Sequence, residues 1–319
     1  MRRSDPIARA GFSRHTLRIC GVALLAFLPA LAGGSAAWAD APLVSAVGVE
    51  NQYADVIAQV GGKYVAVSAI ESDPNTDPHS FEASPKIARE LGAAALVVEN
   101  GIGYDDWADR ILAAAPNVAR KVIDVQHLLG LPDSTSNPHL WYDPKTMPAV
   151  ARAVAADLAA LRPDAAGYFA ANEQRFEASL KPWSDAIAAF RAAHPAVPVA
   201  VTEPVADYLL QALGADIRTP ATLEAAVMND NDPSPQDIST QTGLLTSGAV
   251  KAFAYNQQVT DDLTTSFLEA AKTGKVPVVG VYETMPAGFT YQAWMLAETR
   301  ALEQAVTAGV STEKLVAKQ

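Results

Sequence analysis

The chain has 319 residues, of which 50% are hydrophobic and 18% charged, so it can bury ordinary globular cores and is not expected to be disordered. Its formal net charge of −11 makes nucleic acid and anionic membrane surfaces poor partners. The acidity by itself mainly indicates solubility and is weak evidence for cation handling.

The first 39 residues predict a secretory signal. Five arginines precede an apolar run from Ile19 to Ala32, and Ala37 and Ala39 are the small residues of a cleavage site, which we place after Ala39. A membrane anchor is the alternative, but the apolar run is short and no charged stop-transfer cluster follows it. Removal of five Arg and one Asp with this segment changes the net charge from −11 to −15.

The single cysteine, Cys20, lies at the start of the apolar run. A lipid-attachment cysteine would follow such a run, so lipidation is not expected. The exported chain then has no cysteine, and it uses neither disulfides nor thiolate ligands although export leads to an oxidising compartment. We therefore expect an unlipidated periplasmic protein.

Short β-branched runs alternate with alanine-rich helical stretches along the rest of the chain. This alternation predicts parallel sheets with crossover helices. The runs lie at 43–49, 64–70, 95–100 and 121–125 in the first half and at 197–204, 250–256 and 276–282 in the second, with one further short strand expected within 215–220.

One long amphipathic helix is predicted between the two sets of strands, because apolar side chains recur at helical spacing there. Pro182 lies inside it and removes one backbone donor, which predicts a local bend without a break. The predicted fold class is α/β, with two (βα) lobes of parallel sheet joined by one long rigid helix. The predicted segments are the signal at 1–39, an N-terminal lobe at 40–163, the linking helix at 164–194 and a C-terminal lobe at 195–319.

Four polar side chains follow predicted strands. His79 and His139 lie in loops after the second and fourth runs, and Glu203 and Glu283 come at the ends of two runs in the second half. Open parallel sheets present ligand groups at the carboxyl ends of their strands, so a cleft between the lobes can bring the four together. Two imidazoles and two carboxylates suit zinc or manganese, whereas calcium and magnesium prefer oxygen alone.

Each candidate also has a plainer interpretation. A lone loop histidine is usually a surface residue, although both candidate histidines follow a proline that stiffens the backbone. Glu203 and Glu283 precede helical patterns and can act as charges at helix N-termini. His127 fits a surface or packing role. His194 fits the end of the long helix, where a positive charge interacts favourably with the helix dipole. Glu99 and Asn100 at the end of the 95–100 run, and Asn256 and Gln257 at the end of the 250–256 run, are candidates to orient the imidazoles.

Four longer stretches resemble a known family. They are DPNTDPHSFEASPKIARELGAAALVVENGIGYDDW at 73–107, NPHLWYDP at 137–144, VTEPVADYLLQALG at 201–214 and YETMPAGFTYQAWM at 282–295. Together they are similar to the solute-binding proteins of zinc and manganese ABC importers. The resemblance implies two (βα) lobes joined by a rigid helix, with a divalent metal captured in the interlobe cleft for delivery to a membrane permease.

The resemblance also implies a ligand set. It assigns His79 and His139 to the first lobe and Glu203 to the third position, which is His in many zinc members and Glu in many manganese members. The fourth position, commonly Asp, carries over to Glu283. Many zinc members have a histidine-rich loop between the first two ligands, but the matching stretch at 125–136 is not rich in histidine. Zinc is favoured and manganese stays open.

The sequence thus predicts a periplasmic protein that captures Zn²⁺ or Mn²⁺ and catalyses no reaction. The expected partners are the metal ion and an ABC permease, with no nucleic acid, and the expected state is a monomer. A closed four-ligand shell suits capture, because catalysis needs an open coordination position. The alternative is a secreted metal-dependent hydrolase in which three groups bind metal and one Glu is the base. Neither an HExxH helix nor a GxSxG elbow is present to support it.

Overall fold

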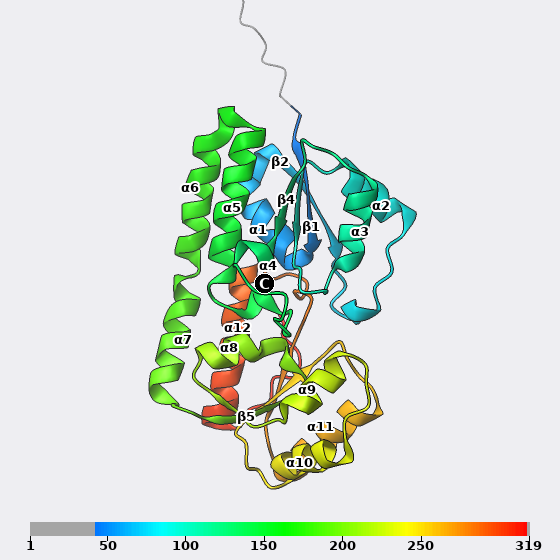
Figure 1. Cartoon of the computed structure of the whole chain (residues 1–319). Helices are drawn as coiled ribbons and strands as arrows, with labels where there is room; N and C mark the ends of the chain where they lie inside the picture. Colours follow the sequence, from blue (N-terminus) through cyan, green and yellow to red (C-terminus); the bar gives the residue numbers. More distant parts are fainter. Residues whose placement is uncertain (1–41, 318–319) are drawn as a thin grey trace, which may run out of the picture. The chain divides into compact units, whose positions relative to one another are not determined.

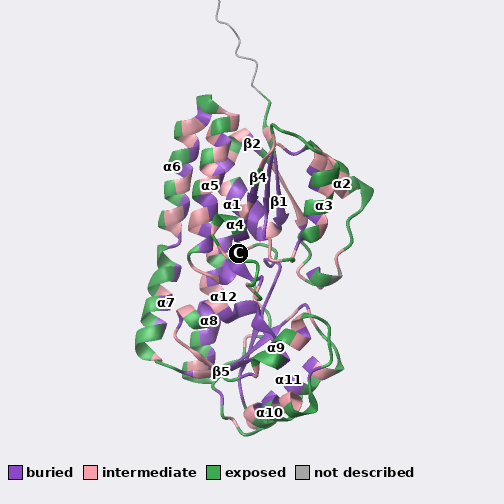
Figure 2. Ribbon diagram, viewed as in Figure 1, coloured by how far each residue is buried: buried purple, intermediate pink, exposed green. Residues whose placement is uncertain are grey.

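The computed structural model describes residues 42–317, in which eight strands form two parallel sheets of four (Figure 1). The predicted signal at 1–39 lies outside the described residues. The strands are β1 Val44–Glu50, β2 Val65–Glu71, β3 Leu96–Glu99, β4 Lys121–Asp124, β5 Pro198–Val201, β6 Asp216–Ile217, β7 Phe253–Asn256 and β8 Val278–Val281. Figure 2 shows the strands β1 and β5, which begin the two sheets, as largely buried, as expected for strands covered on both faces.

Helices cover both faces of each sheet. Two of the buried apolar clusters in residues 42–317 lie on the outer faces of the sheets, under α2 and α3 in one case and under α9, α10 and α11 in the other. None of the helices among these residues is long and apolar enough to cross a membrane. The helices are α1 Asn51–Gly61, α2 Pro85–Ala93, α3 Asp106–Ala114, α4 Val125–Leu128, α5 Thr146–Leu161, α6 Ala166–Ser179, α7 Lys181–Ala193, α8 Asp207–Ala212, α9 Ala221–Met228, α10 Pro235–Thr246, α11 Asp262–Gly274 and α12 Tyr291–Ala308.

Both sheets follow the same plan. Their strand orders are β2-β1-β3-β4 and β6-β5-β7-β8, and every pair is parallel. In each sheet the second strand lies on one side of the first strand, and the third and fourth strands lie on its other side. The strand order therefore reverses direction between β1 and β3 and between β5 and β7, and these are the switch points. The predicted α/β class and all predicted strands, including the short β6, are confirmed. The loops at these switch points are where ligands are expected to bind.

The first strand and first helix pack unusually close together. A Cβ on Gly48 would come within 2.2 Å of the backbone nitrogen of Ala54, so only glycine allows α1 to lie this near β1. The start of α1 then reaches the second half of the chain, where Gln52 donates a hydrogen bond to the carbonyl of Glu283 at 3.2 Å. Close packing inside the first lobe therefore helps to position a candidate ligand of the second.

The linking helix is bent. It consists of α6 and α7, which meet at Leu180, two residues before Pro182, and α6 packs on α5 and α1 while α7 packs on α12 (Figure 1). Proline has no N–H to continue the helical ladder, and the N–H of Leu180 bonds to the carbonyl of Glu177 at 3.1 Å in a tighter turn. The predicted bend is confirmed, and the long helix contacts both halves of the fold.

Candidate metal centre

The two candidate histidines are held by the same local device. His79 lies in a short 3₁₀ turn after β2, and its backbone N–H donates to Oδ1 of Asp77 at 2.8 Å. The backbone N–H of His139 donates to Oδ1 of Asn137 at 3.0 Å. In each case a short polar side chain reaches across the intervening proline and closes a turn, so the backbone of the histidine is restrained before any ligand binds.

The ring of His139 is oriented by the same amide. Its Nδ1 lies 2.8 Å from Oδ1 of Asn137, while the Nδ2 group of Asn137 donates to the carbonyl of Pro204 at 2.8 Å. A carbonyl oxygen only accepts, so the ring proton of neutral His139 belongs on Nδ1. The unprotonated Nε2 then offers its lone pair to the cleft, as metal-ligating histidines usually do.

Three ligand atoms converge at this point. Oε2 of Glu283 lies 3.1 Å from Nε2 of His79 and 3.2 Å from Nε2 of His139, and the ligand atoms of all three residues lie within 4.8 Å of one another. Ligands at zinc distances in a tetrahedral shell are separated by roughly 3.3 Å. The observed spacing therefore fits a bound divalent metal ion, with two nitrogens and one carboxylate oxygen in place.

The pKa values of the two histidines shift in opposite directions. Burial disfavours the charged ring of His79, but the hydrogen bond and charge of Glu283 outweigh it and raise the pKa of His79 to about 9. Burial lowers the pKa of His139, which is fully buried. The two imidazoles hold the pKa of Glu283 well below its usual range although its burial acts in the opposite direction. Without metal, a proton on His79 neutralises Glu283.

Glu203 lies outside the three-residue cluster but is joined to it through one amide. The Nδ2 group of Asn256 donates to Oε1 of Glu203 at 2.8 Å and to Oε1 of Glu283 at 2.7 Å. The other oxygen of Glu203 is buried without a hydrogen-bond partner among residues 42–317. Burial and the charge of Glu283 raise the pKa of Glu203 to about 8. The structure therefore brings His79, His139 and Glu283 together and holds Glu203 close by.

Asn256 has a different role from the one expected of it. It holds two carboxylates and makes no hydrogen bond to either imidazole. Replacing Asn256 by Ala is therefore expected to weaken metal affinity by roughly ten- to a hundredfold, because both carboxylates lose their common donor. A competition titration against a chromophoric chelator measures this loss. The exposed Asn231→Ala variant is the control, and equal affinities of the two variants would contradict the role of Asn256.

Two further contacts to Glu283 were missed by the sequence reasoning. The hydroxyl of Tyr104 donates to Oε2 of Glu283 at 3.1 Å, and the backbone N–H of Glu283 donates to Oε1 of Gln258 at 2.8 Å. Tyr104 lies in the loop after β3 and Gln258 two residues after β7, so both follow strands that border a switch point. That position in the topology is the signal that points to them.

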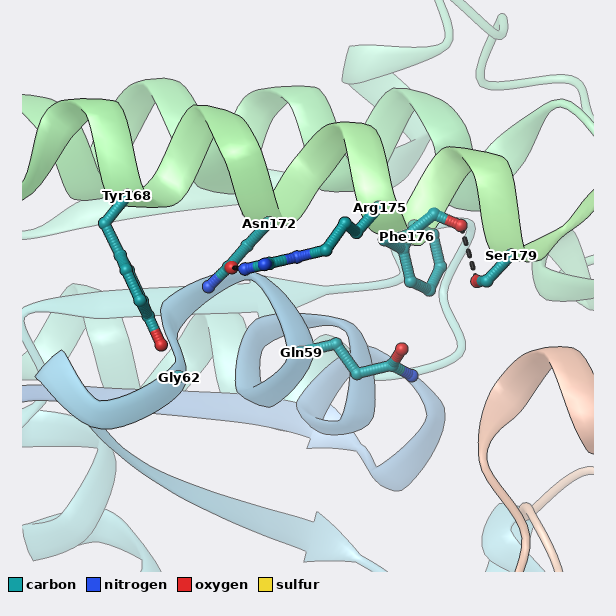
Figure 3. Close-up of a pocket in the computed structure, with 7 residues that line it drawn as sticks. All are labelled: Gln59, Gly62, Tyr168, Asn172, Arg175, Phe176 and Ser179. Atoms are coloured by element: carbon teal, nitrogen blue, oxygen red, sulfur yellow. Dashed lines mark hydrogen bonds between the residues drawn. The ribbon is translucent and has the colours of Figure 1, made fainter.

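A separate pocket of about 340 Å³ lies between the end of α1 and α6 (Figure 3). In it, Arg175 donates to Oδ1 of Asn172, and Nδ2 of Asn172 donates to the carbonyl of Val60 at 2.8 Å. Its lining contains a guanidinium, amides and hydroxyls but no carboxylate or imidazole. The pocket therefore offers neither the imidazole that zinc favours nor a carboxylate to balance a divalent charge, and its guanidinium repels a cation.

The chain matches a described protein family. The family model described as zinc-uptake complex component A, periplasmic (ZnuA), matches residues 49–305. This range includes all four candidate residues and both sheets apart from the first part of β1, so the match covers the site together with most of the scaffold that carries it.

Curated relatives match over shorter stretches. The manganese-binding lipoprotein MntA of Halalkalibacterium halodurans is 26% identical over 126 residues, which is 38% of this chain and 41% of that protein. The chain thus aligns with less than half of the length of this relative.

Solved structures match over nearly their whole length. The periplasmic zinc-binding protein TroA from Treponema pallidum has a TM-score of 0.69 at 18% identity, covering 84% of this chain and 99% of that one. The crystal structure of ZnuA has a TM-score of 0.67 at 19% identity, with the same coverage. At these identities the likeness establishes the fold.

Proposed function

The chain belongs to the family of periplasmic zinc-uptake components A, and we propose that it captures one Zn²⁺ or Mn²⁺ and delivers it to the permease of an ABC importer. The family comprises metal-binding solute-binding proteins of uptake transporters, which deliver their solute and do not transform it. The hydrolase alternative is therefore set aside. In this proposal the metal is cargo, with zinc favoured and manganese second.

The convergence of two imidazoles on one carboxylate oxygen carries the proposal. His139 and Glu283 are 0% and 1% exposed, and the ring proton of His139 is already placed away from the cleft. His79 is the most accessible of the three, with 28% of its side chain exposed. Metal can thus meet His79 first and then reach the two buried ligands.

We assign Glu203 as the fourth ligand. Its free Oε2 is buried without a hydrogen-bond partner among residues 42–317, and the shared donor Asn256 keeps its carboxylate next to Glu283. Two carboxylates balance the charge of a divalent ion, which favours a neutral site in a buried setting. Mixed nitrogen and oxygen ligands suit borderline ions such as Zn²⁺.

The remaining expectations form part of the proposal. We propose export by the 1–39 signal, no lipid attachment at Cys20, a monomeric state and lobes divided at 163/164 and 194/195. The related MntA is a lipoprotein, so lipidation is a point on which this chain is proposed to differ. Mass spectrometry of the exported chain, which reads both the cleavage site and any acyl group, tests this part.

Metal content and thermal melts test capture. Protein purified without chelator is expected to contain about one metal ion per chain. After chelator treatment, Zn²⁺ at a hundred times its dissociation constant is expected to raise the free energy of unfolding by about 2.7 kcal/mol, because it binds the folded state alone. Choline chloride of equal ionic strength is the comparison, because it adds charge to the solution without a metal ligand for this site. If neither Zn²⁺ nor Mn²⁺ shifts the melt, the protein does not capture these metals.

A further inference from the structure

An acid-lined pocket of about 420 Å³ adjoins the candidate metal centre. Asp207 and Tyr208 of α8, Glu224 of α9 and the loop at 134–137 line it, together with Gln211. The loop contributes three hydroxyl side chains in succession. The lining thus offers carboxylates, hydroxyls and amides, and it contains no imidazole or thiol.

The two acids of this pocket are buried without a basic partner. Asp207 is 8% exposed and Glu224 7% exposed. Oδ1 of Asp207 has no hydrogen-bond partner among residues 42–317, and no Lys, Arg or His in that range forms an ion pair with either carboxyl. Buried carboxyls that interact with each other need either a proton or a cation between them.

The titration of the pair agrees with this requirement. Burial raises the pKa of Asp207 to about 6. Burial and the charge of Asp207 raise the pKa of Glu224 to about 9. At neutral pH and without a cation, the pair therefore keeps one proton, which a divalent cation displaces when it binds.

We propose that Asp207 and Glu224 hold a hard divalent cation, Ca²⁺ or Mg²⁺, at a second site in this pocket. Both ions prefer carboxylate, hydroxyl, carbonyl and water oxygens, which distinguishes them from the cargo of the nitrogen-containing centre. The pocket is much larger than a bare ion, so the cation keeps several water molecules, and these bridge to the hydroxyl groups of the loop at 134–137.

The second site touches the loop that carries a cargo ligand. The hydroxyl of Tyr208 donates to the carbonyl of Asn137 at 3.0 Å, and Nδ2 of Asn137 donates to the carbonyl of Pro204 at 2.8 Å. Asn137 in turn orients the ring of His139. A cation held between α8, α9 and this loop therefore restrains the segment from which His139 extends.

The test uses the mature chain with its cargo centre saturated by Zn²⁺, so that any change in melting temperature on adding Ca²⁺ or Mg²⁺ reports binding at the second site. Ca²⁺ or Mg²⁺ at a hundred times the dissociation constant is expected to raise the melting temperature by roughly 5 °C, whereas choline chloride of equal ionic strength does not. The D207N/E224Q double variant is expected to lose this shift while it still binds Zn²⁺, which shows that it is folded.

The exposed Glu303→Gln variant is the matched control and is expected to respond as the wild type does. The proposal is overturned if neither ion shifts the melt of the wild type up to roughly 10 mM, above the range of weak extracellular calcium sites. It is also overturned if the double variant responds like the wild type. The Ca²⁺ and Mg²⁺ melts are repeated without Zn²⁺, so that they do not depend on the cargo centre. A failure of the second-site proposal can then be distinguished from a failure of zinc capture.

Discussion

Replacing Glu283 by Gln is expected to weaken zinc affinity by roughly a thousandfold or more, about 4 kcal/mol. The change keeps the size of the side chain but removes the charge on which His79 and His139 converge. It also replaces one carboxylate oxygen by an NH₂ group, which donates hydrogen bonds and does not accept them. The hydroxyl of Tyr104 or the amide of Asn256 then faces another donor and loses its acceptor. Competition with a chromophoric chelator measures the loss.

Glu303→Gln removes one exposed carboxylate and is the matched control, with affinity expected to equal that of the wild type. A thermal melt without metal checks that both variants fold. If Glu283→Gln binds zinc within about threefold of the wild type, about 0.7 kcal/mol, Glu283 is not a ligand. The other three assignments would then stand on their own evidence.

Metal affinity is expected to rise steeply with pH, because metal and protons compete for the same side chains. The pKa values of His79 and Glu203 are raised to about 9 and about 8, so both groups hold a proton at neutral pH that binding must release. Each group then weakens metal affinity below its pKa, and from pH 8 to pH 6 the two together are expected to lower the affinity by roughly five-thousandfold. His139 has a lowered pKa and contributes no released proton at neutral pH.

The number of released protons distinguishes the role of Glu203. Calorimetric titrations at pH 7 in buffers of different ionisation enthalpy are expected to show about two protons released per Zn²⁺ in the wild type and about one in Glu203→Gln. The pH dependence of the variant falls accordingly to roughly a hundredfold between pH 8 and pH 6. The same proton count in both proteins would remove Glu203 from the ligand set.

The fold was predictable because it depends on local patterns. Runs of β-branched residues alternate with helical stretches throughout both halves, and this alternation specifies parallel sheets whatever the details of packing. The bend before Pro182 was predictable for the same reason, since a missing backbone donor acts locally. Even the short strand β6 at Asp216–Ile217 was indicated by its β-branched residue between turns.

The candidate site was predictable only in part. The proline before each histidine and the strand ends before Glu203 and Glu283 indicated which residues to consider. Neither pattern indicated that both imidazoles would meet one oxygen of Glu283, or that Asn256 would hold the two carboxylates. These contacts join residues that are far apart in the chain, so they depend on how the lobes pack.

The sequence by itself determined the class of fold, the linking helix and the residue types available for a metal, because periodicity, proline and ligand chemistry are properties of short segments. Only the tertiary structure decided which atoms meet. It ranked Glu283 as the centre of the cluster and Glu203 as its neighbour, and it brought the buried acids Asp207 and Glu224 together in the lining of one pocket. The physical reason is that pKa values and coordination depend on burial and on distances between distant segments, which no local pattern contains.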